Sequence, residues 1–133
     1  MAKLFSIGIF DDHPIITSGL TDLLIQSGNF SVDLVANTRD SLLDQLALGQ
    51  IDVLLMDVVV PDVSGLELFK VVCTRFPGLK VIAYTSLTSP ILVENLFIHG
   101  VHGYLNKRQS PSEVTAAILQ VCMGRLYVPE EFE

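Results

Sequence analysis

Short apolar runs alternate along the chain with longer segments in which apolar residues recur every three or four positions. The runs have the length of strands and the segments have the period of helices, an order typical of a parallel sheet covered by helices on both faces. The predicted strands are Leu4–Phe10, Ser31–Val35, Val53–Met56, Val81–Tyr84 and Gly103–Leu105. The pattern therefore predicts an α/β fold built on five parallel strands.

Turn residues and helix caps mark the ends of the predicted helices. The last helix has the clearest start, because Ser110 and Glu113 form a capping-box pattern with Pro111 at the first helical position. The predicted helices run from Pro14 to Gly28, from Arg39 to Leu48 with Ala47 facing inward, from Leu66 to Phe76, from Ser89 onward and from Ser110 onward.

Composition indicates how many domains the chain forms and which partners its charge disfavours. The 133 residues suit one domain, and every apolar run is shorter than the ~18 residues of a membrane span. We expect a cytoplasmic protein that does not contact membranes. The 8 Lys and Arg against 15 Asp and Glu give a net charge of −7, which repels nucleic-acid phosphates. Cys73 and Cys122 fall on apolar helix faces, where free thiols behave as small hydrophobes.

Polar residues follow the predicted strands at the points where the strands end. Asp11 and Asp12 follow the first strand, Asp57 the third, Thr85 the fourth and Lys107 the fifth. In a doubly wound sheet, ligands bind beyond the carboxyl ends of the strands, beside the point where strand order reverses. We therefore expect these side chains to converge on one site.

Three carboxylates in one place repel each other unless a cation balances them, and Mg²⁺ (or Mn²⁺) suits such oxygen ligands. A carboxylate beside this ion can attack phosphorus, and Lys107 would neutralise charge on the transferring oxygens. Each residue also has an ordinary interpretation: Asp11 and Asp12 as a helix cap, Thr85 as a turn hydroxyl, Lys107 as a solvated charge. Their joint placement at strand ends favours a site.

Together these residues resemble the receiver domains of two-component response regulators. The resemblance covers nearly the whole chain, and finer details resemble the NarL/LuxR-type subfamily. It implies a flavodoxin-like strand order 2-1-3-4-5 with helices on both faces, a receiver over residues 1–125, and the start of a linker or tail over 126–133. The motifs that carry it are Asp11-Asp12-His13-Pro14, Asp57 with Pro61 and Gly65, Thr85-Ser86, Gly103-Tyr104-Leu105-Asn106-Lys107 and the run from Gly124 to Pro129.

The resemblance also implies unequal roles for the acidic residues. Asp57 would accept a phosphoryl group from a sensor histidine kinase. Asp12 and Asp57 would bind the metal directly, together with the backbone carbonyl of Val59, and Asp11 would act through metal-bound water. Lys107 would pair with the phosphoryl group.

A switch follows from the same resemblance: Thr85 would be drawn toward the phosphoryl group, and Tyr104 would turn inward. From its place on an edge strand we expect Tyr104 to be half-buried, and plain packing is the alternative interpretation. Val59 and Leu87 are apolar where the family is expected to carry polar residues that help the hydrolytic water. We predict a long-lived phosphorylated form from this departure.

The leading prediction is a phosphorylation-controlled receiver, not an enzyme beyond its own phosphorylation and dephosphorylation. Its output would be transcription, with DNA bound only through a helix-turn-helix domain not present in this chain, and a homodimer is an expected partner state. The alternatives are a stand-alone receiver acting by protein contact, a degenerate docking module, and an aspartyl-nucleophile phosphatase-like enzyme. Val59 disfavours the last, since such enzymes carry a second acid there.

Three histidines invite a metal role that we do not favour. No third nitrogen or thiolate ligand accompanies His99 and His102, and we expect His13 to be a loop residue or a partner contact.

Overall fold

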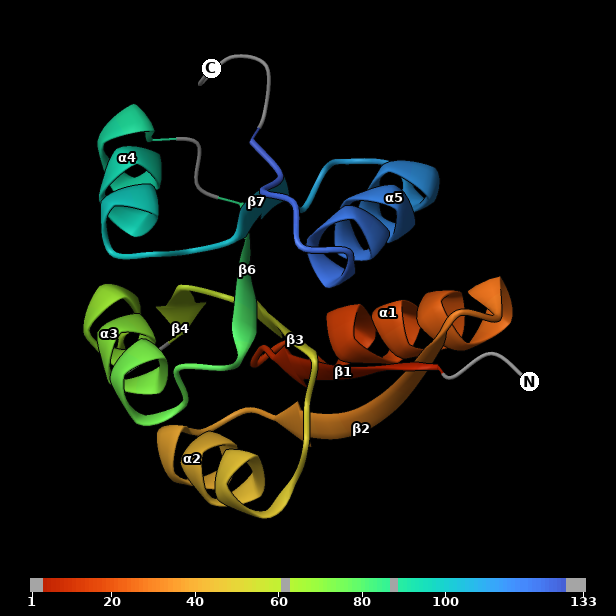
Figure 1. Ribbon diagram of the computed structural model, residues 1–133, viewed down its shortest axis with the longest axis horizontal. Coiled ribbons are helices and arrows are strands. Elements are labelled where there is room, and N and C mark those ends of the chain that lie inside the picture. The colour runs from red at the N-terminus through yellow and green to blue at the C-terminus, as the bar shows by residue number, and fades with distance from the viewer. Residues whose placement is uncertain (1–3, 61–62, 87–88, 129–133) are drawn as a thin grey trace.

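A parallel sheet forms the centre of the molecule, as the computed structural model shows for residues 4–60, 63–86 and 89–128 (Figure 1). Its strands lie in the order β2-β1-β3-β6-β7, and each neighbouring pair is parallel. This confirms the predicted 2-1-3-4-5 order. The strands are β1 (Phe5–Phe10), β2 (Phe30–Ala36), β3 (Val53–Met56), β6 (Lys80–Thr85) and β7 (Gly103–Asn106).

Five helices among the described residues cover the two faces of this sheet. Helices α1 and α5 pack on one face, and α2, α3 and α4 pack on the other (Figure 1). The capping box at the start of α5 is confirmed, with Ser110 and Glu113 each accepting from the other's backbone N–H. The helices are α1 (Pro14–Ser27), α2 (Arg39–Leu48), α3 (Gly65–Arg75), α4 (Pro90–Ile98) and α5 (Pro111–Cys122).

The strands divide their side chains between two hydrophobic cores. Along β1, Ile7 and Ile9 pack with α1 and α5, whereas Phe10 packs on the opposite face, because successive strand residues point to opposite sides. Strand β3 is buried on both faces over its whole length, as expected for an inner strand of a parallel sheet. The polar residues at or just beyond the carboxyl ends of the strands are thereby held at one edge of the sheet.

A short antiparallel hairpin after β3 was not predicted. It pairs β4 (Val59–Val60) with β5 (Val63–Ser64), immediately before α3. A Cβ atom at Gly65 would clash with the carbonyl group of Val58, so only glycine allows the chain to turn back this closely. The hairpin and Gly65 together fix the path of the backbone that follows Asp57.

Two burial predictions were wrong. Ala47 is exposed, because the buried stripe of α2 is limited to Leu42, Leu43 and Leu46. Tyr104 was expected to be half-buried, but only 1% of it is exposed. It joins the core that contains α4, and its strand is covered at the outer edge by Tyr127, which forms an isolated bridge with Gly103. The predicted boundary after residue 125 stays a prediction.

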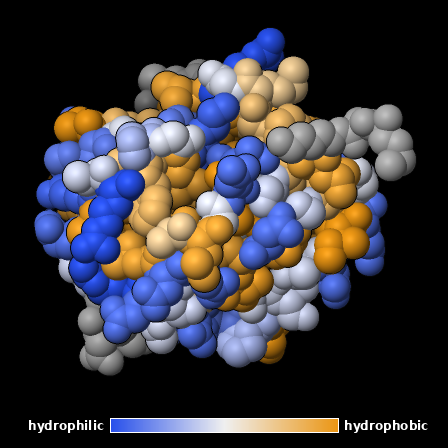
Figure 2. Space-filling model, turned by 60° about the horizontal axis from the view of Figure 1, so that its bottom comes forward, coloured by the Kyte–Doolittle hydropathy of each residue, from blue (hydrophilic) through white to orange (hydrophobic). Residues whose placement is uncertain are grey.

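The surface mixes apolar and hydrophilic side chains, and the face that includes α2 shows both kinds interspersed (Figure 2). Leu48, Ile15 and Ile91 are among the exposed large apolar residues. Within the described part of the chain, no helix is both long and apolar enough to traverse a bilayer. Cys73 and Cys122 are free thiols, each partly buried against a hydrophobic core.

Candidate functional site

Four titratable side chains meet at the carboxyl edge of the sheet. Asp11, Asp12, His13 and Asp57 each offer one ligand atom, and these atoms lie within 4.8 Å of one another. Strands β1 and β3 are direct neighbours, and the Asp57 N–H donates to the Phe10 carbonyl at 2.9 Å. The pairing of these two strands therefore brings the carboxylates together from distant parts of the sequence.

The Asp57 side chain is buried and held at both oxygens. It is 2% exposed; its Oδ1 accepts from the Val59 N–H at 2.9 Å, and its Oδ2 accepts from Lys107 Nζ at 2.9 Å. Asp57 follows a strand that is buried throughout, where an unpaired charge would be costly. Its carboxylate is thus fixed in place at the sheet edge.

Lys107 supplies positive charge to two of the acids. Its Nζ lies 2.7 Å from Asp11 Oδ2 and 2.9 Å from Asp57 Oδ2. Burial opposes the ammonium charge, but the contacts with Asp11 and Asp57 outweigh it and raise the pKa of Lys107. The backbone N–H of Lys107 also donates to the Thr85 carbonyl at 3.0 Å, which fixes it beside the end of β6.

His13 directly precedes α1, and its ring contacts two residues of the acidic cluster. Its Nδ1 is 2.7 Å from Asp11 Oδ1 and 3.1 Å from Asp12 Oδ1, while its ring remains largely exposed. The adjacency of Asp11, Asp12 and His13 in sequence was the available signal. The side-chain rotamer that folds the imidazole back over both carboxylates leaves no trace in the sequence pattern.

Thr85 is the last residue of β6, and Tyr104 is the second residue of β7. Thr85 is fully buried and Tyr104 is 1% exposed. Strands β6 and β7 pair Ala83 with Tyr104 and Thr85 with Asn106, so Tyr104 lies two residues before the level of Thr85. Burial raises the pKa of the neighbouring Tyr84, and Lys107 Nζ lies 5.9 Å from the centroid of its ring.

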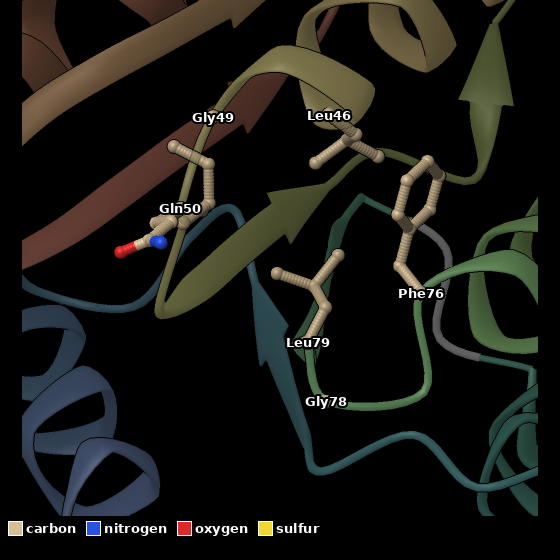
Figure 3. Close-up of a pocket in the computed structure, with 7 residues that line it drawn as sticks. Leu46, Gly49, Gln50, Phe76, Gly78 and Leu79 are labelled. Atoms are coloured by element: carbon tan, nitrogen blue, oxygen red, sulfur yellow. The ribbon is translucent and has the colours of Figure 1, made fainter.

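Two hollows differ in whether ionisable side chains line them. One, of about 260 Å³, opens beside Asp11 and Asp12 between the start of α1 and the end of β2. The other, of about 230 Å³, lies near the amino ends of β3 and β6, where Leu46, Phe76 and Leu79 point toward one another (Figure 3). None of the residues that line this second hollow, all in the described part of the chain, carries an ionisable side chain. Only the first hollow adjoins groups suited to phosphoryl chemistry.

Comparison with known families agrees with this geometry. The family described as the response regulator receiver domain matches residues 7–119. The chain belongs to the response regulator receiver family. Receivers of this family are signalling regulators of two-component systems rather than conventional enzymes.

The relatives of this receiver are NarL/LuxR-type transcription regulators. UhpA of Salmonella typhimurium is 32% identical over 126 residues, which cover 94% of this chain and 62% of UhpA. ComA of Bacillus subtilis is 30% identical over 122 residues, covering 90% of this chain and 57% of ComA. DevR/DosR of Mycobacterium tuberculosis, named a DNA-binding transcriptional activator, is 30% identical over 94% of this chain and 56% of its own length. The chain therefore spans a little over half the length of these relatives.

Solved receiver structures have the same fold. The isolated REC domain of RcsB from Salmonella enterica serovar Typhimurium, in the presence of the phosphomimetic BeF₃⁻, has a TM-score of 0.90 and 24% identity, covering 98% of this chain and 96% of that one. The non-phosphorylated RcsB receiver of Escherichia coli has a TM-score of 0.89 and 25% identity, covering 96% of this chain and all of that one. These comparisons establish the receiver fold.

The receiver brings the predicted acidic and basic residues into one cluster, as the strand-end placement required. Thr85 lies in β6, where its carbonyl accepts the Lys107 N–H, and Tyr104 lies in β7. Val59 is 45% exposed beside Asp57, whereas Leu87 and Pro61 lie outside the described residues. The other histidines are not part of the cluster in the described structure: His99 is exposed, and the His102 ring accepts the Val81 N–H at 3.1 Å.

Proposed function

We propose that this chain is a phosphorylation-controlled receiver in which Asp57 accepts a phosphoryl group from a sensor histidine kinase. The observation that carries the proposal is the carboxylate of Asp57, buried at a strand end and held by Lys107 and the Val59 N–H beside two further carboxylates. A fixed carboxylate next to a cation is the arrangement that an aspartyl nucleophile needs.

In the transfer step, one carboxylate oxygen of Asp57 forms a bond to phosphorus while the bond from phosphorus to the kinase histidine nitrogen breaks. Negative charge spreads over the transferring oxygens, and Lys107 is placed to offset it. Water later attacks the acyl phosphate, which releases inorganic phosphate and restores the Asp57 carboxylate. We predict that this hydrolysis is slow, because Val59 and Leu87 are apolar where the family is expected to carry polar residues that help the hydrolytic water.

The acidic cluster fits a bound divalent cation. Asp11 Oδ2 and Asp12 Oδ1 are buried, and their partners in the described structure are Lys107 Nζ at 2.7 Å and His13 Nδ1 at 3.1 Å. Each carboxylate oxygen has a second lone pair that a cation could use. Asp12, Asp57 and the Val59 carbonyl would hold Mg²⁺ or Mn²⁺ directly, and Asp11 through water. The ion would supply charge that favours negative oxygens at this edge.

The proposed switch consists of Thr85 and Tyr104. The acyl phosphate would carry about −1.5 to −2 charges in place of the single negative charge of the Asp57 carboxylate, and it would bring new acceptor oxygens toward the Thr85 end of β6. Movement of Thr85 would alter the packing around the buried Tyr104, which belongs to the same core as α4. The surface of α4 and β7 would then report the phosphorylation state.

The proposed output is regulation of transcription in the cytoplasm. It rests on relatives named as transcriptional regulators, which are longer than this chain. DNA contact would come through a helix-turn-helix domain outside these residues. Self-association into a homodimer is also proposed, and a stand-alone receiver acting by protein contact is the alternative output.

The test is intact mass after incubation with Mg²⁺ and acetyl phosphate. Wild type is expected to gain one phosphoryl group that hydroxylamine removes, as it does from acyl phosphates. Asp57→Asn is expected to gain none, while Asp40→Asn, which alters an exposed carboxylate in α2, should behave as wild type. Equal labelling of wild type and Asp57→Asn would contradict the assignment of Asp57.

A further inference from the structure

The segment 126–128 pairs with the outer edge of β7. The Tyr127 N–H donates to the His102 carbonyl at 3.0 Å, and the Tyr104 N–H donates to the Tyr127 carbonyl at 3.2 Å. A Cβ atom at Gly103 would lie 3.3 Å from the Cβ of Tyr127, so glycine favours this close approach. The segment therefore binds the backbone of the very strand that carries Tyr104.

The Tyr127 side chain reaches the loop between β7 and α5. Its hydroxyl accepts from Gln109 Nε2 at 3.1 Å, and Gln109 Oε1 accepts from the Asn106 N–H at 2.8 Å. One glutamine side chain thus connects the loop to segment 126–128. Because both of its polar ends are used, a shift of the loop changes the contact with Tyr127.

The same loop holds Lys107. The Gln109 N–H donates to the Asn106 carbonyl at 3.0 Å, which closes a tight turn around Lys107. The backbone of Lys107 is anchored to Thr85, and its Nζ lies between Asp11 and Asp57. A continuous set of bonds therefore runs from the Asp57 carboxylate through Lys107 and Gln109 to Tyr127.

We propose that Gln109 and Tyr127 form a link through which phosphorylation of Asp57 loosens segment 126–128 from the edge of β7. The proposal rests on the proposed function for its input. The observed link belongs to the form in which Lys107 pairs with two bare carboxylates. A phosphoryl group places its acceptor oxygens farther out, so Lys107 follows them and turns the loop that holds Gln109. Segment 126–128 is the two-state element that this movement biases.

Amide hydrogen exchange at Tyr127 and Tyr104 tests the link, with and without Mg²⁺ and acetyl phosphate, and intact mass reports the phosphorylation. In wild type, protection of both amides is expected to fall about fivefold on phosphorylation, the effect of losing one ordinary hydrogen bond. Tyr127→Phe removes only the hydroxyl and is expected to abolish that response.

Gln120→Met is the matched control. Gln120 Nε2 donates to the Leu126 carbonyl at 2.7 Å, so it anchors the same segment without touching the loop. This variant is expected to lower protection in both states and keep the fivefold response. Unchanged protection of wild type at full phosphorylation would refute the link and leave the proposed function standing.

A second arm needs no phosphorylation. Lys107→Met and Gln109→Met are compared in the unmodified protein, and both are expected to lower protection at Tyr127. Gln109→Met leaves every described contact of Asp57 in place, so it keeps the test valid where Lys107→Met does not fold. Protection in Gln109→Met equal to that of wild type would overturn the link, whether or not Asp57 accepts a phosphoryl group.

Discussion

Lys107 lies between two buried carboxylates, and its ammonium group contacts both Asp11 and Asp57. Breaking a buried ion pair by removing one partner typically costs about 3 to 5 kcal/mol, because the remaining charge is left without compensation. An exposed pair is worth only about 0 to 1 kcal/mol. The two kinds of lysine in this chain should therefore respond very differently to the same substitution.

We predict that Lys107→Met lowers the free energy of unfolding at pH 7 by about 3 kcal/mol, and that Mg²⁺ restores part of the loss. The raised pKa of Lys107 means that its contribution is complete at neutral pH and disappears only as pH rises through the alkaline folded-state value. Urea unfolding with and without Mg²⁺ measures both effects. Lys70→Met removes an exposed pair with Glu67 at 3.4 Å and is the control; an equal loss in both variants would refute the interpretation.

For individual residues, the sequence predicted which side chains gather at the carboxyl edge of the sheet, but not all of the contacts that they make. Residues that follow parallel strands must share one edge, so Asp11, Asp57 and Lys107 could be placed together without coordinates. The contact of His13 with both neighbouring acids depends on a side-chain rotamer. The burial of Tyr104 depends on tertiary packing over an edge strand.

The hairpin β4–β5 determines the path of the backbone that follows Asp57, and the close approach of Gly65 to Val58 is possible only because residue 65 has no side chain. A methyl group at Gly65 would clash with the carbonyl of Val58. Gly65→Ala is therefore predicted to destabilise the protein by about 1 to 3 kcal/mol through forced backbone movement, and to slow phosphorylation of Asp57. Thermal or urea unfolding and the rate of mass gain measure the two effects.

Gly19→Ala is the matched control, and it is predicted to raise the free energy of unfolding where Gly65→Ala lowers it. Nothing lies within 4 Å of the Cβ position of Gly19, which is exposed inside α1. Alanine in a helix interior is favoured over glycine by about 0.5 to 1 kcal/mol, so this variant should be more stable than wild type. Destabilisation of both variants to the same extent would show that the contact with Val58 does not matter.

The five main strands and the helices between them were predictable because each has a clear hydrophobic period and a recognisable cap or breaker. The hairpin was not, since strands of two residues, Val59–Val60 and Val63–Ser64, are too short to show any period. The pairing of Tyr127 with β7 was missed for a similar reason. One bridge at the edge of a sheet leaves no pattern in the sequence.

The free energy of unfolding of the whole molecule is predicted to fall when His102 is protonated. Burial, followed by the charge of Lys80, lowers the pKa of His102, and its Nδ1 must stay unprotonated to accept the Val81 N–H. The unfolded chain then binds a proton more readily than the folded one. Stability from this group is complete above the ordinary pKa of about 6.5 and is lost as pH falls toward the lower folded-state value.

Unfolding free energies measured between pH 7.5 and 5.5 should therefore decline by up to about 1.4 kcal/mol per pH unit from this one proton. His102→Asn keeps an acceptor without the titration and should have a shallower slope. His99→Asn changes an exposed histidine and should follow wild type. Identical slopes in all three proteins would refute the role of His102.

The overall architecture follows from the burial of the parallel strands and from the order in which they lie. Parallel strands buried on both faces need helices on both sides, and reversal of strand order after β1 opens a crevice at the carboxyl edge. The acidic cluster lies at this edge, next to the hollow beside Asp11 and Asp12. The amino edge carries the apolar hollow of Figure 3 instead.

Mapping the modified residue after phosphorylation tests most directly whether Asp57 is the phosphoacceptor. The protein is treated with Mg²⁺ and acetyl phosphate, reduced with borohydride to convert an acyl phosphate into a stable alcohol, digested and analysed by mass spectrometry. Conversion is expected at Asp57 and at no other carboxylate. Conversion at Asp11 or Asp12 with Asp57 intact, or no conversion in protein that binds Mg²⁺, would contradict this expectation.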